Sequence, residues 1–152
     1  SYTRSKARSN AVIDVNLDNP VFSQQMGGVL PWDTPNRLIS WGYLPMFWGF
    51  DLAYTLEWRN GFPFSVVNQD QQVVGSPNSL RFPVYFSANL HAERRFSFLG
   101  RQWALRAGFN DVTGRRNPTS VNNNIDAGNN FLDFGGNQHR TFVGRIRFLG
   151  RK

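Results

Sequence analysis

The stretch Val84–Phe98, VYFSANLHAERRFSF, has the clearest periodicity in the chain. Its even-numbered positions are apolar except for Arg94, whereas its odd-numbered positions are mostly polar. Successive side chains of a β-strand point to opposite faces, so the pattern predicts a strand with one apolar and one polar face. Strands of globular sheets average about five or six residues. A run of about fifteen is typical of a strand that crosses a bilayer at a tilt and continues beyond it.

The same alternation predicts five further strands. They are Ser1–Arg8, Arg37–Leu44, Phe50–Phe64, Gln102–Asn110 and Thr141–Phe148. In Phe50–Phe64 the even positions are apolar except for Asn60, while the charged residues Asp51, Glu57 and Arg59 share the odd positions. Charges confined to one face indicate that this face meets water and the other meets apolar material.

In Arg37–Leu44 the large side chains of Ile39, Trp41 and Tyr43 share one side of the predicted strand.

The connections alternate between long and short. Long polar segments cover Ser9–Asn36, Val66–Pro83 and Thr113–His139, and tight links cover Leu44–Trp48 and Leu99–Arg101. Outer-membrane barrels show this asymmetry, with short periplasmic turns and longer extracellular loops. The predicted fold is therefore all-β, an antiparallel meander of about six long strands that is part of a larger transmembrane β-barrel. Because closed single-chain barrels start at about eight strands, we expect further strands upstream in a longer chain.

Composition narrows the classes of function. Mean hydropathy is −0.44, and no apolar run approaches the roughly 18 residues of a membrane-spanning helix. The absence of cysteine excludes disulfides and thiolate metal sites. The net charge of +7 suggests an anionic partner, either nucleic acid or lipopolysaccharide. On the strands, rings and charges mostly occupy opposite faces, whereas a single-strand stacking platform needs them together. We therefore expect outer-membrane lipid and lipopolysaccharide as partners and no nucleic acid.

Aromatic residues gather near the predicted strand ends, as in the interfacial girdles of membrane barrels. They are Trp48, Phe50, Phe62, Phe64, Phe96 and Phe98. In lipid only helices and closed barrels pair all backbone polar groups, which favours a barrel for strands of this kind.

Six short motifs occur in a specific order along nearly the whole chain. They are Leu30–Arg37 (LPWDTPNR), Arg59–Ser65 (RNGFPFS), Asn78–Pro83 (NSLRFP), Leu90–Phe96 (LHAERRF), Gly108–Thr113 (GFNDVT) and Arg145–Leu149 (RIRFL). Together they resemble the extreme C-terminus of TonB-dependent outer-membrane receptors, above all those with an N-terminal carboxypeptidase-regulatory-like domain.

The resemblance implies a barrel of about 22 strands with a plugged lumen. Residues 1–152 would be the C-terminal part of that barrel, a fragment without the plug domain and the upstream strands. The implied function is uptake of a scarce nutrient such as a siderophore or a saccharide across the Gram-negative outer membrane. The implied partners are the rest of the barrel, the plug domain, and TonB through the missing N-terminal region. One departure is that Phe148 is followed by four more residues, whereas many family members end on an aromatic residue.

No arrangement in the sequence indicates catalysis, so we expect no enzyme. Ser65, Ser87 and Ser120 lack the neighbours of a nucleophile elbow. Glu57 and Glu93 could form a pair of carboxylates, but the expected partners of these two residues are the arginines at positions 59, 94 and 95, in cross-strand ion pairs.

No cofactor or metal is expected either. His91 and Glu93 alone are a poor ligand set, and His139 is expected to be solvated.

Ligand contact is expected in the loops, because binding residues concentrate on loops held by a rigid scaffold. The candidates are Trp32, Asp33, Asn68, Gln69, Asp70, Asn122, Asn124, Asp126 and Asp133.

Two other hypotheses stay open. One is a soluble β-sandwich or small barrel that binds a ligand, and the other is a porin or autotransporter translocator. The soluble hypothesis predicts that Leu56, Phe86 and Leu90 are enclosed in the interior of this chain.

Overall fold

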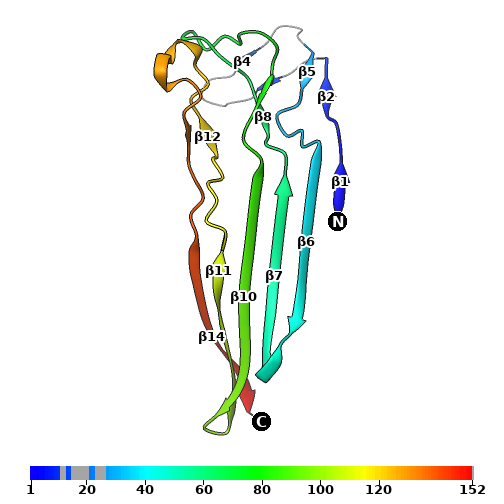
Figure 1. Ribbon diagram of the computed structural model, residues 1–152, viewed down its shortest axis with the longest axis vertical. Coiled ribbons are helices and arrows are strands. Elements are labelled where there is room, and N and C mark those ends of the chain that lie inside the picture. Colours follow the sequence, from blue (N-terminus) through cyan, green and yellow to red (C-terminus); the bar gives the residue numbers. More distant parts are fainter. Residues whose placement is uncertain (11–12, 15–20, 23–26, 152) are drawn as a thin grey trace.

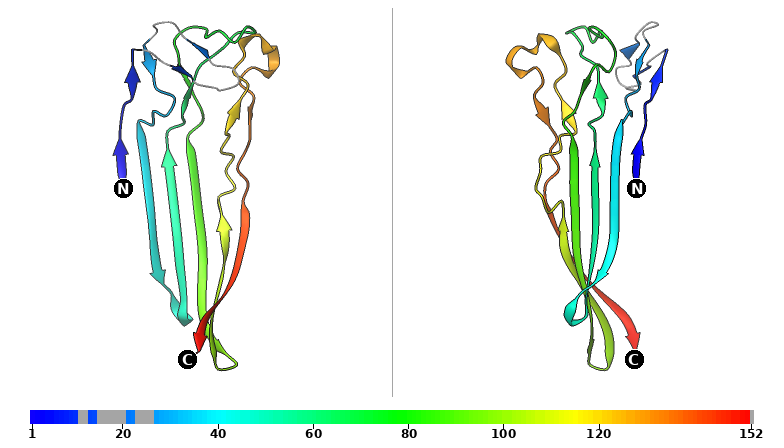
Figure 2. Two further views of the ribbon diagram at one scale, coloured as in Figure 1. Left: turned by 180° about the vertical axis from the view of Figure 1, so that it is seen from behind. Right: turned by 45° about the vertical axis from the view of Figure 1, so that its right-hand side comes forward.

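The computed structural model describes residues 1–10, 13–14, 21–22 and 27–151. Six antiparallel strands form one sheet in chain order, so the predicted all-β meander is confirmed (Figure 1). The strands are β1 (Tyr2–Arg4), β6 (Asn36–Pro45), β7 (Phe50–Arg59), β10 (Tyr85–Phe98), β11 (Arg101–Asn110) and β14 (Thr141–Arg151). The sheet is twisted, as the views from behind and from the side show (Figure 2). No helix within the described ranges is long and apolar enough to cross a membrane.

The long connections are folded and gather at one end of the sheet (Figure 1). They contain four short antiparallel pairs and the 3₁₀ helix η2 (Ile125–Asn130). The pairs are β2 (Arg8–Ser9) with β5 (Gly28–Val29), β3 (Ile13–Asp14) with β4 (Val21–Phe22), β8 (Pro63–Phe64) with β9 (Leu80–Arg81), and β12 (Ser120–Val121) with β13 (Phe134–Gly135). We call the described residues of the segments 5–35, 60–84 and 111–140 the loop cap. The turns β6–β7, with the 3₁₀ helix η1 (Phe47–Gly49), and β10–β11 form the opposite, turn end.

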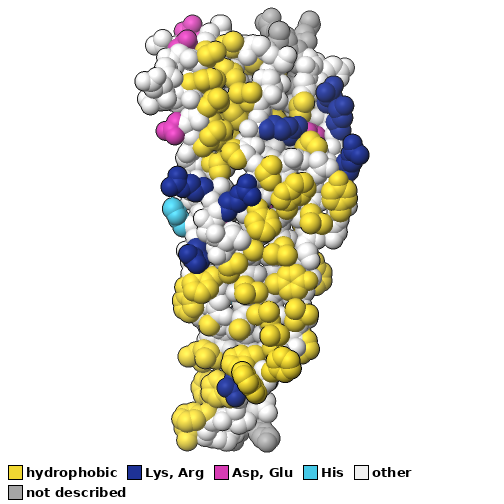
Figure 3. All heavy atoms as spheres, in the orientation of Figure 1, with side chains coloured by type: hydrophobic (Ala, Val, Ile, Leu, Met, Phe, Trp, Pro, Cys, Tyr) yellow, Lys and Arg dark blue, Asp and Glu magenta, His cyan; other side chains and the backbone are white. Residues whose placement is uncertain are grey.

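The strand register gives the sheet two chemically distinct faces, because residues opposite one another in an antiparallel pair point to the same side. Leu90 pairs with Tyr54 on β7 and with Phe109 on β11, and Phe109 in turn pairs with Phe142 on β14. The apolar face defined by these pairs also carries Leu38, Leu44, Leu52, Leu56, Phe86, Leu105 and Ile146. Hydrophobic side chains cover nearly all of it toward the turn end (Figure 3).

This chain does not enclose its own apolar face. Leu56 is 37% exposed, Leu90 40% and Ile146 69%. The chain exposes 10,796 Å², whereas a compact monomer of its mass exposes roughly 7,900 Å². The surplus indicates that the strands do not enclose a globular core within this chain.

Residue burial is concentrated in the loop cap. The rings of Phe64 and Phe82, from the connection between β7 and β10, and of Phe134, from the connection between β11 and β14, meet edge-to-face at centroid distances of 5.2 to 6.3 Å. Val66 and Val67 are buried beside this region of the chain. The cap therefore has a small apolar core of its own.

The predicted strand Phe50–Phe64 is wrong in its last third. β7 ends at Arg59, and Phe64 belongs to β8 in the cap. Phe62 and Phe64 are therefore no part of an aromatic girdle on the sheet. The alternation of apolar residues continues past the end of β7 by coincidence, because the apolar residues that follow pack in the loop cap. The pattern alone does not distinguish these residues from a continuing strand.

One more expectation needs correction, because the predicted strand Ser1–Arg8 is divided into β1 and β2. Ile39, Trp41 and Tyr43 share one side of β6, as predicted. The register with β7 places that side on the polar face, because the three residues pair with Glu57, Thr55 and Ala53.

Glycine substitutions test the register of β11. A Cβ at Gly108 would lie 2.2 Å from the Leu90 carbonyl oxygen and 2.6 Å from the His91 Cα, both backbone atoms. At Gly144 on the paired strand β14 the nearest atom is a side-chain carbon of Phe142 at 3.5 Å. We expect Gly108→Ala to lower the free energy of unfolding by about 1–3 kcal/mol, as overpacking does. Gly144→Ala is the control and should change it far less. Denaturant unfolding followed by circular dichroism measures both, and equal effects would contradict the register.

Candidate functional site

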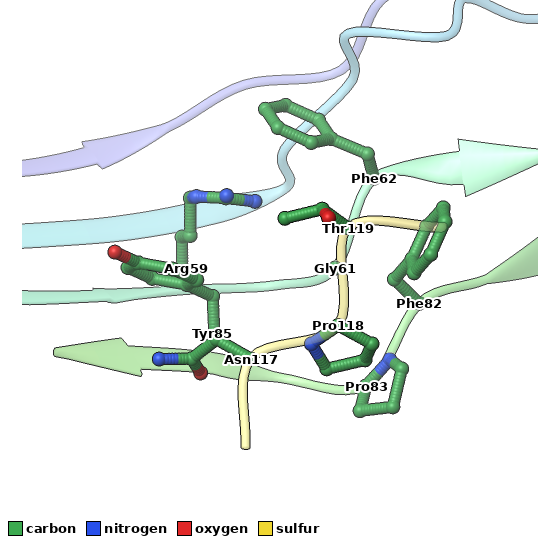
Figure 4. Close-up of a pocket in the computed structure, with 9 residues that line it drawn as sticks. All are labelled: Arg59, Gly61, Phe62, Phe82, Pro83, Tyr85, Asn117, Pro118 and Thr119. Atoms are coloured by element: carbon green, nitrogen blue, oxygen red, sulfur yellow. The ribbon is translucent and has the colours of Figure 1, made fainter. Parts of the chain in front are cut away.

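A pocket of about 260 Å³ lies where the sheet meets the loop cap (Figure 4). Three segments far apart in the sequence line it. They contribute Arg59 at the end of β7 with Gly61 and Phe62 just beyond it, Phe82, Pro83 and Tyr85 around the start of β10, and Asn117, Pro118 and Thr119 before β12. We call it the junction pocket.

Local backbone chemistry brings the first two segments together. A Cβ at Gly61 would lie 1.8 Å from the carbonyl oxygen of Phe82, so only glycine permits this approach. Just beyond it, the Phe82 N–H donates to the Phe62 carbonyl at 2.9 Å. Pro83 follows and has no N–H for a ladder, which separates β9 from β10. Strand pairing is therefore interrupted at this point, and a space is left between the sheet and the cap.

Asn117 fixes the third segment. Its buried side chain donates from Nδ2 to the Phe86 carbonyl at 2.9 Å and accepts from the Phe86 N–H at 3.2 Å. The amide thus pairs both backbone groups of a β10 residue, as a neighbouring strand would. Pro118 and Thr119 are held against the pocket as a result.

Arg59 is the central charged residue of the pocket. The carbon of its guanidinium lies 4.1 Å from the centroid of Phe62 and 4.3 Å from the centroid of Tyr85 (Figure 4). Cations over ring faces are stabilised by the ring quadrupole, and more strongly when desolvated. Its Nε lies 3.6 Å from the carboxylate of Glu57, and only 18% of its side chain is exposed.

The pocket combines one fixed cation with apolar walls. Phe82, Pro83 and Pro118 supply apolar surface, while Arg59 supplies donors in a planar fork. Such a combination of apolar surface with a few placed polar groups is typical of small-molecule sites.

The sequence did not predict this pocket, since Arg59 was expected to form an ion pair and Phe62 to belong to a strand. Asn60-Gly61, Pro63 and Pro83 did indicate that strands end nearby, because such residues mark strand ends. Their convergence in space was not visible in the sequence.

The structure brings together one group of the predicted loop residues. The carboxylate of Asp126 accepts from the Gln69 N–H at 2.8 Å, which joins the second and third long loops. Asn68 accepts from the Gln72 N–H at 2.8 Å, and Asn124 accepts from the Asp126 N–H at 2.9 Å.

Other members of that group lie nearby in the same loops. Asn122 accepts from the Asn124 N–H at 3.3 Å, and the Asp133 carbonyl accepts from the Asn122 N–H at 2.9 Å. Asp70 is exposed at the tip of its loop. Most of these polar groups therefore shape the loops themselves.

The remaining two candidates lie in another part of the cap. Asp33 is only 3% exposed, forms an ion pair with Arg81, and accepts from the Ala7 N–H at 2.6 Å. Its carboxylate is already satisfied by these partners. Trp32 is exposed.

The carboxylates on the polar face have arginine partners, but the expected partners Arg59 and Arg95 pair within the same strand as their carboxylates, and the cross-strand partners are arginines of β6 and β14. Glu57 pairs with Arg59, and also with Arg37 at 3.0 Å. Glu93 pairs with Arg95 at 3.8 Å and with Arg147 at 2.9 Å.

The prediction that Arg94 pairs with one of these carboxylates is wrong. It lies on the apolar face, over the ring of Phe50. Arg94 and Glu93 are neighbours on one strand, so their side chains point to opposite faces. The pairing of the carboxylates with Arg37 and Arg147, in contrast, depends on the register between strands and cannot be read from one strand alone.

The two histidines have separate surroundings. The His91 ring lies 3.1 Å from the Asn110 side-chain oxygen, through Nε2. His139 is exposed. Within the described residues, no group of three or more His, Asp or Glu side chains is placed to hold a metal ion.

Comparison with known proteins gives no match, neither to a protein-family model nor to a curated protein or a solved structure.

Substitutions of Asp33 and Asp70 test whether the buried, paired carboxylate of Asp33 stabilises the cap more than the exposed carboxylate of Asp70. Asp33→Ala should lower stability by about 1–3 kcal/mol, because the part-buried Ala7 N–H and Nη2 of Arg81 lose their acceptor. Asp70→Ala should stay within about 0.5 kcal/mol, as for exposed surface positions. Denaturant unfolding and limited proteolysis of the cap measure the difference. A tolerated Asp33→Ala would show that the ion pair does not hold the cap together.

Proposed function

We propose that the chain forms part of the wall of an outer-membrane β-barrel, in a receptor of the TonB-dependent type that takes up a scarce nutrient such as a siderophore or a saccharide. The observation that carries this proposal is the continuous apolar face, which runs across β6, β7, β10, β11 and β14 and stays exposed. Exposed apolar patches of this extent mark contact with a partner or a membrane.

The dimensions of the sheet fit a bilayer. β6, β7 and β11 have ten residues each, and β14 has eleven, against about 9–11 for a tilted membrane strand. Phe86 and Phe96 on β10 lie about 33 Å apart along the strand at about 3.3 Å per residue. A tilt of about 45° reduces this to about 23 Å, close to the apolar band of about 25 Å in outer-membrane barrels.

Aromatic residues border that band at both ends. Trp58 pairs with Phe86 next to the cap. Phe96 pairs with Trp103 toward the turn end, and Trp103 packs edge-to-face on Phe148 at 5.2 Å. Aromatic girdles occupy these positions at membrane interfaces.

The polar face fits a water-filled or plugged lumen. It carries the ion pairs of Glu57 and Glu93, together with Asn89, His91 and Arg106. Interior faces of outer-membrane barrels are polar in this way. The plug domain and the rest of the barrel are the partners proposed for this face and for the sheet edges.

The two ends of the sheet differ as the two sides of an outer membrane require. The cap lies at one end and the tight turns lie at the other (Figure 1). In outer-membrane barrels long loops are extracellular and short turns are periplasmic. The cap would thus face the medium and lipopolysaccharide, and the turns would face the periplasm with the TonB system.

Arginine substitutions distinguish the two faces. Leu56→Arg and Leu90→Arg should block membrane assembly, at a cost of about 2–4 kcal/mol near the bilayer midplane. Thr55→Arg and Asn89→Arg, one residue before each on the polar face, are the matched controls and should assemble. The amount of protein recovered in washed outer membranes measures the outcome. Equal losses on both faces would contradict the proposal.

Single cysteines test the environment directly, because the chain has no cysteine of its own. In membranes, Leu105→Cys and Ile146→Cys should react with a lipid-dissolved maleimide and resist a water-soluble one. Ala104→Cys and Arg145→Cys, their neighbours on the polar face, should resist the lipid-dissolved reagent. A protein that stays soluble without detergent and labels equally at Ile146→Cys and Arg145→Cys would overturn the membrane proposal.

A further inference from the structure

Arg59 retains unused hydrogen-bonding capacity inside the junction pocket. Its Nε faces Glu57, and the two faces of its guanidinium are covered by Phe62 and Tyr85. Among the described residues, no hydrogen bond takes up its Nη1 or Nη2. These two groups form the outer edge of a planar fork whose orientation is fixed by the rings on either side.

The charge around Arg59 is also in excess. Arg37 and Arg59 share the single carboxylate of Glu57, at 3.0 and 3.6 Å respectively. Two guanidinium groups against one carboxylate leave one positive charge uncompensated. Arg37 is 47% exposed, whereas Arg59 is 18% exposed and lines the pocket. An anion entering the pocket would meet the less solvated of the two cations.

The apolar walls of the pocket indicate what the rest of the ligand should be. Phe82, Pro83 and Pro118 present flat apolar groups around the space in front of Arg59 (Figure 4). The volume of about 260 Å³ is at the lower limit of small-molecule sites, which run from about 300 Å³. The pocket therefore fits a small molecule, or one end of a larger one.

We propose that the junction pocket binds a carboxylate attached to a flat apolar body. The two carboxylate oxygens accept from Nη1 and Nη2 of Arg59 in the bidentate geometry that guanidinium favours. The apolar body lies against the proline and phenylalanine walls. The inference rests on the proposed function in one respect, namely that such a group would belong to the nutrient that is taken up.

The test uses the intact protein in detergent micelles and three probes in isothermal titration calorimetry. Phenylacetate carries both the charge and the ring, phenylacetamide lacks the charge, and acetate lacks the ring. We expect phenylacetate to bind at least about tenfold more tightly than either of the others, since one charge-assisted bidentate contact accounts for a factor of this size. Equal affinity for phenylacetate and phenylacetamide would overturn the proposal without any variant.

Variants then place the site. Arg59→Gln should weaken phenylacetate binding at least about tenfold. Arg37→Gln removes the other partner of Glu57 outside the pocket, and with it the surplus charge, but leaves the fork of Arg59 in place. It is the matched control and should weaken binding clearly less than Arg59→Gln. Arg59→Lys keeps the charge and loses the fork, so its affinity should lie between those of wild type and Arg59→Gln. Circular dichroism checks that each variant keeps its β-structure.

The outcomes separate this inference from the membrane proposal. Membrane labelling as proposed, with no preference for phenylacetate, would refute the ligand and leave the barrel wall standing. A soluble protein that still binds phenylacetate through Arg59 would refute the barrel wall alone. Loss of binding in Arg37→Gln equal to that in Arg59→Gln would show that the charge network, and not the pocket, carries the affinity.

Discussion

The backbone ladder of the sheet holds five long strands in a register that places most of their apolar positions on one side, with Ile39, Trp41 and Tyr43 of β6 as the main exceptions. Leu90 illustrates the constraint, because it faces Tyr54 on one neighbour and Phe109 on the other. A slip of one residue in any pair would move charges such as Glu93 to the apolar side. The sheet therefore has one mainly apolar and one mainly polar face, and the side chains of the apolar face stay exposed in this chain.

Stability is divided between two regions with different solvents. In the loop cap, Phe64, Phe82 and Phe134 form a conventional small core, and Asp33 and Asn117 satisfy buried backbone groups around it. In the sheet, few side chains are buried by the chain itself. The proposed barrel wall with extracellular loops would need this division, a cap with its own core and a sheet whose apolar face meets lipid.

The junction pocket lies on the boundary between these regions. Strand pairing stops at Arg59, Gly61 allows the next backbone to approach, and Asn117 replaces a strand partner for Phe86. The boundary thereby leaves a space that neither the ladder nor the cap core fills. A guanidinium held between two rings at this position has a fixed orientation and an open edge, a suitable arrangement for recognising a small anionic group.

The sequence by itself determined the antiparallel meander, the order of long and short connections, and the faces of β7, β10, β11 and β14. These features follow from the period of two and from turn residues, both of which are local. Only the tertiary structure decided that Trp41 lies on the polar face, that Phe64 is in the cap core, that Asp33 is a structural carboxylate, and that Arg59 lines a pocket. Each of these depends on strand register or on contacts between distant loops. Such contacts join residues that are far apart in the sequence, so a local pattern does not predict them.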